Sequence, residues 1–179
     1  MHWLFKAYTS ALRRHPVIVQ SVQSGIFLSI GDVISQVIVE AKNPKTMSYK
    51  RTMQYFCVGA IYVGPVLTIW YKILHKYVGT EGKFYGLKKM AIDQFGFAPF
   101  GIAGFVISTA VFQGNSLQET KRKLKEVYPA ILKANYTVWP AVQLVNFTLM
   151  PLQYQVLYQQ TIGLLWNTYI CYKTKPDDD

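Results

Sequence analysis

The sequence has few charged residues, and its longest segments have almost none. Charged residues make up 16% of the 179 residues, compared with about 25% in soluble domains. Lys and Arg are absent from residues 17–39, 53–71, 90–115 and 134–172, where only Asp32 and Asp93 introduce a charge. A helix needs about 20 mostly apolar residues to cross a bilayer, and a charge at mid-membrane costs at least about 2.5–3.5 kcal/mol. The pattern therefore predicts an integral membrane protein.

Cysteine is also scarce, and the N-terminus lacks the apolar core and cleavage site of a secretory signal. Cys57 and Cys171 both lie in apolar stretches, which favours small buried side chains over a disulfide. No acidic residue precedes Asp32, and residues 3–14 place apolar side chains on one helical face. This pattern is weakly similar to a mitochondrial presequence and is equally typical of an uncut interfacial helix.

The residue sets that support catalysis or metal binding are missing. His2, His15 and His75 lie in loops or at the ends of apolar stretches, without metal-ligand spacing. The sequence contains no phosphate loop, dinucleotide fingerprint or nucleophile elbow. It therefore predicts no enzymatic activity, no metal site and no cofactor.

Basic residues gather in the connections between the apolar stretches. The net charge is +10, and basic loops are typical of anchoring to anionic lipid. Charge alone would also suit nucleic acid, but there is no recognition module, so no nucleic-acid partner is predicted. Because loops on both sides would be basic, the positive-inside rule leaves the orientation open. The same loops could concentrate anionic solutes at either face.

The expected fold class is all-α, an integral membrane bundle of about four transmembrane helices plus an amphipathic surface helix. Residues 1–172 would form one domain, and residues 173–179 a polar tail. We expect an interfacial helix at 1–15, spans at about 16–40, 50–77 and 87–111, and the amphipathic helix at 116–134. Ser116 and Glu119 would start that helix with a capping box. Residues 134–172 would add one full span with a shallow segment, or two short spans.

Small residues and prolines mark predicted close contacts and kinks. Gly25 and Gly64 each share a four-residue spacing with another small residue, which lets a neighbouring helix approach closely. Proline removes a helical hydrogen bond, and its ring clashes with the preceding turn. Packing sites or kinks are therefore also expected at Pro65, Pro99, Gly101, Pro140 and Pro151.

Polar side chains inside the apolar stretches are the candidate functional residues. An ionisable residue in a span marks a functional site by default, although Asp32 and Asp93 could equally order the bundle through hydrogen bonds. Amides in a span either join helices, at about 0.6–2 kcal/mol each, or line a polar path. The amides in question are Gln36, Gln94, Gln143 and Asn146. Our hypothesis is a polar seam between spans, lined by Asp32, Gln36, Asp93 and Gln94.

Five short motifs follow one another along the chain. They are Gly31-Asp32-x-x-x-Gln36, Gly64-Pro65-x-x-x-x-Trp70-Tyr71, Asp93-Gln94-x-x-x-x-Pro99, Trp139-Pro140-x-x-Gln143-x-x-Asn146-Phe147-x-x-x-Pro151 and Trp166-Asn167-x-Tyr169. In this order and spacing they resemble the Mpv-seventeen family of mitochondrial and peroxisomal membrane proteins. The resemblance covers nearly the whole chain, and residues 87–99 and 135–154 are most similar to the mitochondrial branch.

The resemblance implies a four-span protein of the mitochondrial inner membrane, with the peroxisomal membrane as the alternative location. It also implies a channel for small polar solutes that supports deoxynucleotide supply and mitochondrial DNA maintenance. The alternative function is a non-conducting scaffold or partner-binding subunit. Homo-oligomers are left open, because so small a bundle has little room for a wide pore. Two positions depart from the family pattern: Gln155 replaces a common Arg, and Thr68 replaces a His found in several relatives.

Overall fold

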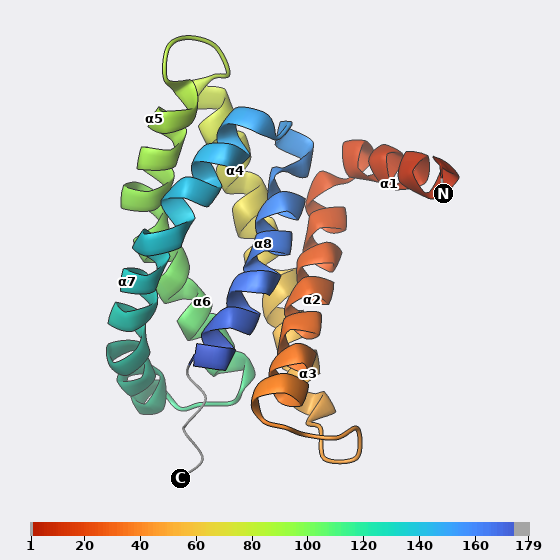
Figure 1. Cartoon of the computed structure of the whole chain (residues 1–179), viewed down its shortest axis with the longest axis vertical. Coiled ribbons are helices and arrows are strands. Elements are labelled where there is room, and N and C mark those ends of the chain that lie inside the picture. Colours follow the sequence, from red (N-terminus) through yellow and green to blue (C-terminus); the bar gives the residue numbers. More distant parts are fainter. Residues whose placement is uncertain (1, 174–179) are drawn as a thin grey trace.

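The structure is a computed structural model that describes residues 2–173, and among these the side chains of residues 3 and 6–166. All the elements it describes are helices (Figure 1). They are α1 (His2–Arg14), α2 (Pro16–Ile34), α3 (Tyr49–Cys57), α4 (Gly64–Val78), α5 (Tyr85–Ala91), α6 (Ala98–Phe112), α7 (Leu117–Leu149) and α8 (Leu152–Lys173). Three π-helical segments, η1 (Ser35–Val39), η2 (Val58–Val63) and η3 (Ile92–Phe97), extend α2, join α3 to α4 and join α5 to α6.

The expected all-α fold is confirmed, and three of its helical segments are suited to span a membrane. Helical segments of 24, 30 and 28 residues, at Pro16–Val39, Tyr49–Val78 and Tyr85–Phe112, are long and apolar enough to cross a membrane. At 1.5 Å per residue each exceeds the roughly 30 Å of hydrocarbon. In the described residues α7 and α8 do not meet the same standard, because the first half of α7 is charged and α8 carries four glutamines. The predicted count of four spans is therefore not reproduced.

Local sequence signals explain where the helices begin and end. Pro16 occupies the first turn of α2, and the Ser48 hydroxyl caps α3 by accepting from the Arg51 backbone N–H. The predicted capping box is present at the start of α7, where Ser116 and Glu119 bond each other's backbone N–H groups. Gly79 ends α4 with a positive φ of 75°, a conformation that glycine adopts without strain.

Polar side chains face inward and large apolar side chains face outward, the reverse of a soluble protein. On α2, Ile18, Val22, Ile26 and Ile30 form an exposed stripe at four-residue intervals. The opposite stripe, which is buried in the bundle and continues into η1, contains Gln20, Ser24, Asp32 and Gln36. Four-residue intervals keep each set on one helical face. This arrangement matches hydrocarbon outside the bundle and polar contacts within it.

Pro65 and Pro99 are the second residues of α4 and α6. Each of these helices follows directly on a π-helical segment. Pro65 follows η2, and Pro99 follows η3. Each proline lacks an N–H and displaces the carbonyl four residues earlier, and a π-helical turn accommodates such a displaced carbonyl. Gly101 leaves room for the Phe97 ring, since a Cβ built there would lie 3.0 Å from that ring.

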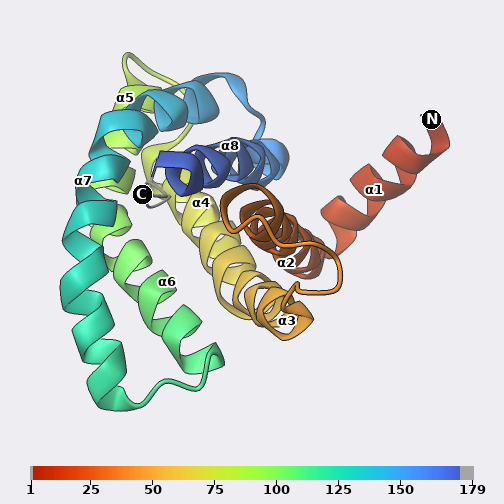
Figure 2. The ribbon, with the colours of Figure 1, turned by 60° about the horizontal axis from the view of Figure 1, so that its bottom comes forward.

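Residues 116–134 do not form the separate surface helix that we predicted, and Pro140 does not divide its stretch. These residues are the first half of α7, which continues through Pro129 and Pro140 and ends just before Pro151. The carbonyls that the two internal prolines displace belong to Lys125 and Tyr136, which are exposed, so the helix can bend there instead of breaking. Figure 2 shows α7 curving around α6, and α6 is its main packing partner.

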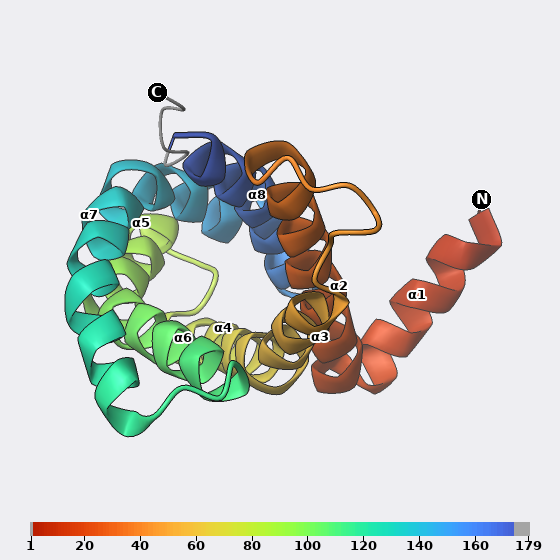
Figure 3. The same ribbon diagram turned by 90° about the horizontal axis from the view of Figure 1, so that it is seen from below.

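The helices form a ring when viewed along the bundle (Figure 3). The segment α2 packs against α3, η2, α4 and α8, while α7 packs against α5 and α6. Helix α1 projects away from the ring (Figures 1 and 3) and is tied to α2 by the buried Leu12 and by a 2.6 Å bond from the Tyr8 hydroxyl to Gln23 Oε1. A helix is therefore present where one was expected at residues 1–15, and its interfacial position stays a prediction.

Close helix crossings hold α2 against the second span. A Cβ built on Gly64 would lie 2.5 Å from the Cα of Ser21, and one built on Gly25 would lie 2.9 Å from the Phe56 ring. Gly59, which sequence analysis did not single out, faces the backbone of Ser24 and Gly25 at even shorter range. A buried apolar cluster of Leu67, Tyr71, Leu74, Phe147 and Val156 joins α4, α7 and α8 nearby.

Candidate functional site

The two intramembrane acids belong to separate clusters. Asp32 lies on α2 near the α2–α3 connection and is bound by the start of α3. Its Oδ1 accepts from Arg51 Nε at 2.7 Å, and its Oδ2 accepts from the Thr52 hydroxyl at 2.6 Å and from Gln36 Nε2 at 2.8 Å. These bonds satisfy the carboxylate within its own cluster. Neither Asp32 nor Gln36 is among the residues that line the cavity described below.

The Asp32 cluster closes the connection between α2 and α3. Arg51 Nη2 lies 2.5 Å from Glu40 Oε1, and Gln36 Oε1 accepts from the Ser48 backbone N–H at 2.7 Å. Sequence analysis missed Arg51, together with Glu40, Ser48 and Thr52. The sequence did offer a signal for Arg51. It is a positive charge at the start of the second span, and a short loop separates it from the negative charge of Asp32 near the end of the first span.

Glu40 makes the stability of this connection depend on pH. The hydrogen bond from Arg51 lowers the Glu40 pKa below its ordinary value of 4.5, and Lys42 adds to the effect. Because the folded pKa is depressed, the stabilisation is present above the unfolded pKa and is lost as pH falls through the folded pKa. We expect the melting temperature in detergent to drop more steeply below pH 4.5 for the wild type than for Glu40→Gln. Equal slopes would remove Glu40 from the pH dependence.

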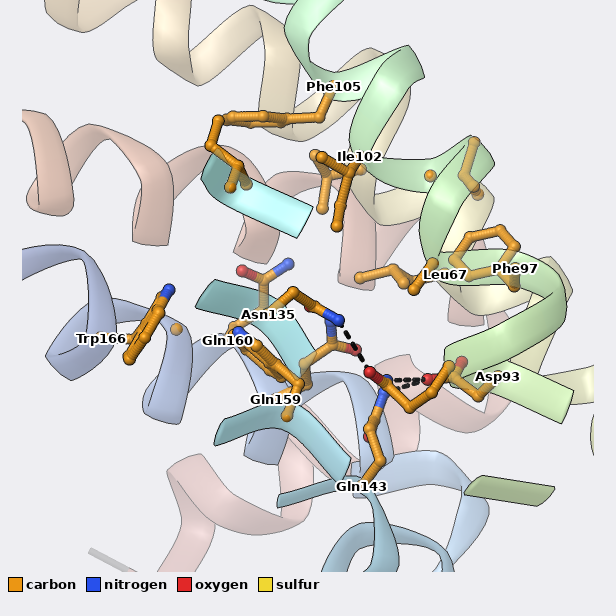
Figure 4. Close-up of a pocket in the computed structure, with 18 of the residues that line it drawn as sticks. Leu67, Asp93, Phe97, Ile102, Phe105, Asn135, Gln143, Gln159, Gln160 and Trp166 are labelled. Carbon is orange, nitrogen blue, oxygen red and sulfur yellow. Dashed lines mark hydrogen bonds between the residues drawn. The ribbon is translucent and has the colours of Figure 1, made fainter. Parts of the chain in front are cut away.

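A cavity of about 230 Å³ lies among α2, η2–α4, η3–α6, α7 and α8. Its walls are largely apolar and aromatic, with Leu67, Phe97, Ile102, Phe105 and Trp166 around the space (Figure 4). At one end the lining becomes polar and contains Asp93, Gln94, Asn135, Gln143, Gln159 and Gln160. Cavities of this kind, apolar with a few convergent polar groups, are the usual form of small-molecule sites.

Asp93 is the centre of the polar end. Its side chain is buried, and the residue is 2% exposed. Oδ1 accepts from the Trp70 indole N–H at 2.7 Å, and Oδ2 accepts from Gln94 Nε2 at 2.8 Å and from Gln143 Nε2 at 3.0 Å. These donors come from α4, η3 and α7, so the carboxylate joins three elements. Trp70 is held in place by stacking on Phe97, with ring centroids 4.6 Å apart.

Amides extend this network in two directions. Gln143 Nε2 also donates to the Tyr71 hydroxyl at 2.8 Å, and Gln143 Oε1 accepts from Asn146 Nδ2 at 2.9 Å. On the cavity side, Asn135 Nδ2 donates to Gln94 Oε1 at 2.8 Å (Figure 4). The structure therefore brings Asp93, Gln94, Gln143 and Asn146 together, as a group separate from Asp32 and Gln36.

Sequence analysis missed the contributions of α8 and of Asn135 in the middle of α7. Gln159 and Gln160 face the cavity, and Gln160 Nε2 donates to the Ser24 hydroxyl at 2.9 Å. Asn135 faces them from α7. The available signal was a series of four glutamines in an uncharged helix, which is unusual for a lipid-facing surface.

The two departures from the family pattern lie outside the lining of the cavity beside Asp93. Gln155 is buried and donates to the Met150 carbonyl at 3.1 Å, which closes the end of α7. The Thr68 hydroxyl lies 2.5 Å from Gln20 Oε1 and so bridges α4 and α2. Both residues therefore make helix-joining contacts.

The site offers hydrogen bonds and one carboxylate rather than a metal-binding set. Among the side chains that the structure describes, no three His, Cys, Asp or Glu residues gather closely enough to hold a metal ion. Cys57 is a free, half-buried thiol, and the Cys171 side chain lies outside the described residues, as do those of Asn167 and Tyr169. Amides and a carboxylate can replace part of the hydration shell of a polar solute.

Comparison with known proteins gives full-length relatives. The sequence pattern of the family described as "Mpv17 / PMP22 family" matches residues 110–171 of the chain. The chain is 40% identical over 170 residues to the Mus musculus protein named Mitochondrial inner membrane protein Mpv17, covering 95% of this chain and 97% of that one. The Danio rerio protein of the same name is 36% identical over 173 residues, which are 97% of this chain and 98% of that one. Protein SYM1 of Gibberella zeae is 38% identical over 165 residues, which are 91% of this chain and 93% of that one.

No solved structure matches the chain. The relatives confirm both the family resemblance and the expected location, because they align over nearly the whole length of each protein. The chain thus belongs to the Mpv17/PMP22 family and is a protein of the mitochondrial inner membrane.

Proposed function

We propose that this protein is a channel for small polar solutes in the mitochondrial inner membrane. The observation that carries the proposal is the cavity among membrane-spanning helices whose polar end contains Asp93, Gln94 and Gln143. Polar groups are costly inside a membrane, so those that face a cavity commonly mark a solute or ion path. The route we propose runs along the inner faces of η3–α6, α7 and α8.

Asp93 would set the charge preference of this route. A carboxylate that lines a narrow path attracts cations and repels anions. The charge of Asp32 is compensated by Arg51 at 2.7 Å, so it adds little to the field in the cavity. Basic loops at both ends of the bundle act in the opposite sense and concentrate anions near the mouths. The family resemblance is the support for the wider role that we include in the proposal, in deoxynucleotide homeostasis and mitochondrial DNA maintenance.

Substitution of Asp93 should change selectivity. In liposomes containing the purified protein, we expect Asp93→Asn to lower the preference for cationic over anionic solutes, because it removes the charge and retains an acceptor oxygen. Asp32→Asn is the matched control, since its side chain lies outside the cavity, and we expect it to leave selectivity unchanged. Identical selectivity in the wild type and both variants would exclude Asp93 from the path.

A larger side chain at Gly163 should block the same path. Gly163 lines the cavity, and a Cβ built there would lie 3.7 Å from the Trp139 ring. Gly163→Leu therefore places new atoms in the cavity without touching Asp93. We expect a loss of most solute flux with the melting temperature nearly unchanged. Full flux through a folded Gly163→Leu protein would move the path elsewhere.

A non-conducting membrane scaffold is the second candidate function. It is favoured by amides that pair across helices, as Gln160 does with Ser24 and Gln20 with Thr68. In this case the polar residues would act only to join helices. Absence of flux in liposomes at every pH, redox and voltage condition, with the protein folded, would favour the scaffold.

A further inference from the structure

A second cavity, of about 310 Å³, lies at the other end of the polar cluster. It is formed where α2 and α8 begin, at the upper end of the bundle in Figure 1. The residues that define it include Gln20, Thr68, Tyr71, Lys72, Gln153 and Val156. Its lining includes polar groups from α2, α4 and α8, and Lys72 adds a positive charge.

Tyr71 separates this second cavity from the one beside Asp93. Its side chain lines the second cavity and is 1% exposed. Its hydroxyl accepts from Gln143 Nε2 at 2.8 Å and donates to Gln159 Oε1. Gln143 and Gln159 both line the first cavity. One tyrosine therefore contacts one cavity with its ring and the lining of the other with its hydroxyl.

On both α4 and α8, residues that are close in sequence line different cavities. On α4, Leu67 lines the first cavity and Thr68 lines the second. On α8, Val156 lines the second cavity and Gln159 lines the first. The two cavities thus share the α4 and α8 walls. Tyr71 lines the second cavity and is hydrogen-bonded to two glutamines that line the first.

The geometry points to Tyr71 as the closed gate between two halves of one path through the bundle. This inference rests on the proposed channel function and names the residue that closes the channel. In the closed state the ring is held edge-on against Phe147, with centroids 5.3 Å apart and planes at 88°, and the hydroxyl is held by the two glutamines. Movement of the ring to another rotamer breaks both hydroxyl bonds and joins the cavities.

Gln143 couples the gate to the Asp93 site. Its Nε2 donates both to the Tyr71 hydroxyl at 2.8 Å and to Asp93 Oδ2 at 3.0 Å. A cationic or hydrogen-bonding solute that occupies Asp93 competes for this carboxylate and changes how Gln143 shares its amide. Once displaced from Asp93, the Gln143 amide loses the bond that orients it and can turn away from the Tyr71 hydroxyl, which is then held less firmly. Solute binding on one side of the gate therefore favours its opening.

Removal of the ring should open the path. Minor conformations of two-state proteins are populated at about 0.1–10%, so a permanently open path should raise solute flux at least about tenfold in Tyr71→Ala. Tyr71→Phe keeps the ring and loses the two hydroxyl bonds, so we expect a smaller increase. Tyr77→Ala is the matched control, because Tyr77 lies on the same helix and is 77% exposed. Its flux should equal that of the wild type.

The outcomes separate the gate from the channel proposal. Flux in the wild type with no increase in either folded Tyr71 variant would overturn the gate and leave the channel intact. Absence of flux in the wild type and in every folded variant would overturn the channel itself.

A labelling experiment tests the gate without measuring conduction. Single cysteines are placed at Gln153 in the second cavity and Gly163 in the first, in a chain with Cys57 and Cys171 changed to Ser. A membrane-impermeant thiol reagent is added to one side of oriented vesicles. With Tyr71 present, each cysteine should react from one side only, and with Tyr71→Phe from both. Reaction from both sides with Tyr71 in place, or identical patterns with and without its hydroxyl, would overturn the inference.

Discussion

Arg51→Ala should destabilise the protein by about 3 kcal/mol. Removing one partner of a buried ion pair lowers the free energy of unfolding by about 3–5 kcal/mol. The lower end applies here, because the Arg51 side chain is 28% exposed while that of Asp32 is 2% exposed. The substitution leaves the Asp32 carboxylate without its cation and frees Glu40 as well. For a chain of this size we expect the melting temperature in detergent to fall by roughly 6–12 °C.

Two further variants isolate the role of the ion pair. Arg122→Ala removes an arginine whose side chain is 73% exposed and lies 4.0 Å from Glu126, so its melting temperature should be almost unchanged. Adding Asp32→Asn to Arg51→Ala removes the unpaired charge and should restore part of the loss. A double variant that is no more stable than Arg51→Ala alone would contradict the assigned role of the Asp32 charge.

Gly59→Ala should have an effect at least as large. A Cβ at this position would lie 2.7 Å from the Cα of Gly25 and closer still to the Ser24 carbonyl. Both obstacles are backbone atoms, so the added methyl group can be accommodated only if α2 moves away from η2. Overpacking a tight interface typically costs about 1–3 kcal/mol, and the upper end or more is expected here. The expected result is a lower melting temperature and a reduced yield of monodisperse protein.

Gly96→Ala provides a close control for Gly59→Ala. Gly96 also lies in a π-helical segment, but a Cβ there meets its nearest neighbour, Ile92, at 3.9 Å. The same methyl group should therefore be tolerated, and the higher helix propensity of alanine could add up to about 1 kcal/mol of stability. Equal losses in the two variants would show that the α2–η2 crossing is not the cause.

The elements that the sequence predicted well are those in which a single physical requirement dominates. The first three spans were placed within about two residues, because the bilayer demands long uncharged segments with charges only at their ends. The capping box at Ser116 and Glu119 was also correct, since it depends on residues three apart. The location and the family were predicted correctly from motifs that occur in order along nearly the whole chain.

The prediction of a separate surface helix failed because local patterns say nothing about available partners. Residues 116–134 have an apolar face and a basic face, which suits a membrane surface. In the structure these residues belong to α7, which packs against α6 and continues through Pro129 and Pro140. A proline breaks a helix only where the displaced carbonyl cannot find room, and that depends on the surroundings.

The sequence by itself determined that hydrocarbon surrounds this protein and that Asp32 and Asp93 had to be explained, since a long uncharged stretch and a charge within it are read from residue types alone. Only the tertiary structure decided how these residues divide. It paired Asp32 with Arg51 across the α2–α3 connection and placed Asp93 with Gln143, Gln159 and Tyr71 between two cavities. Hydrogen-bond partners 19 to 88 residues apart are chosen by how helices cross, and helix crossings depend on packing that no local pattern contains.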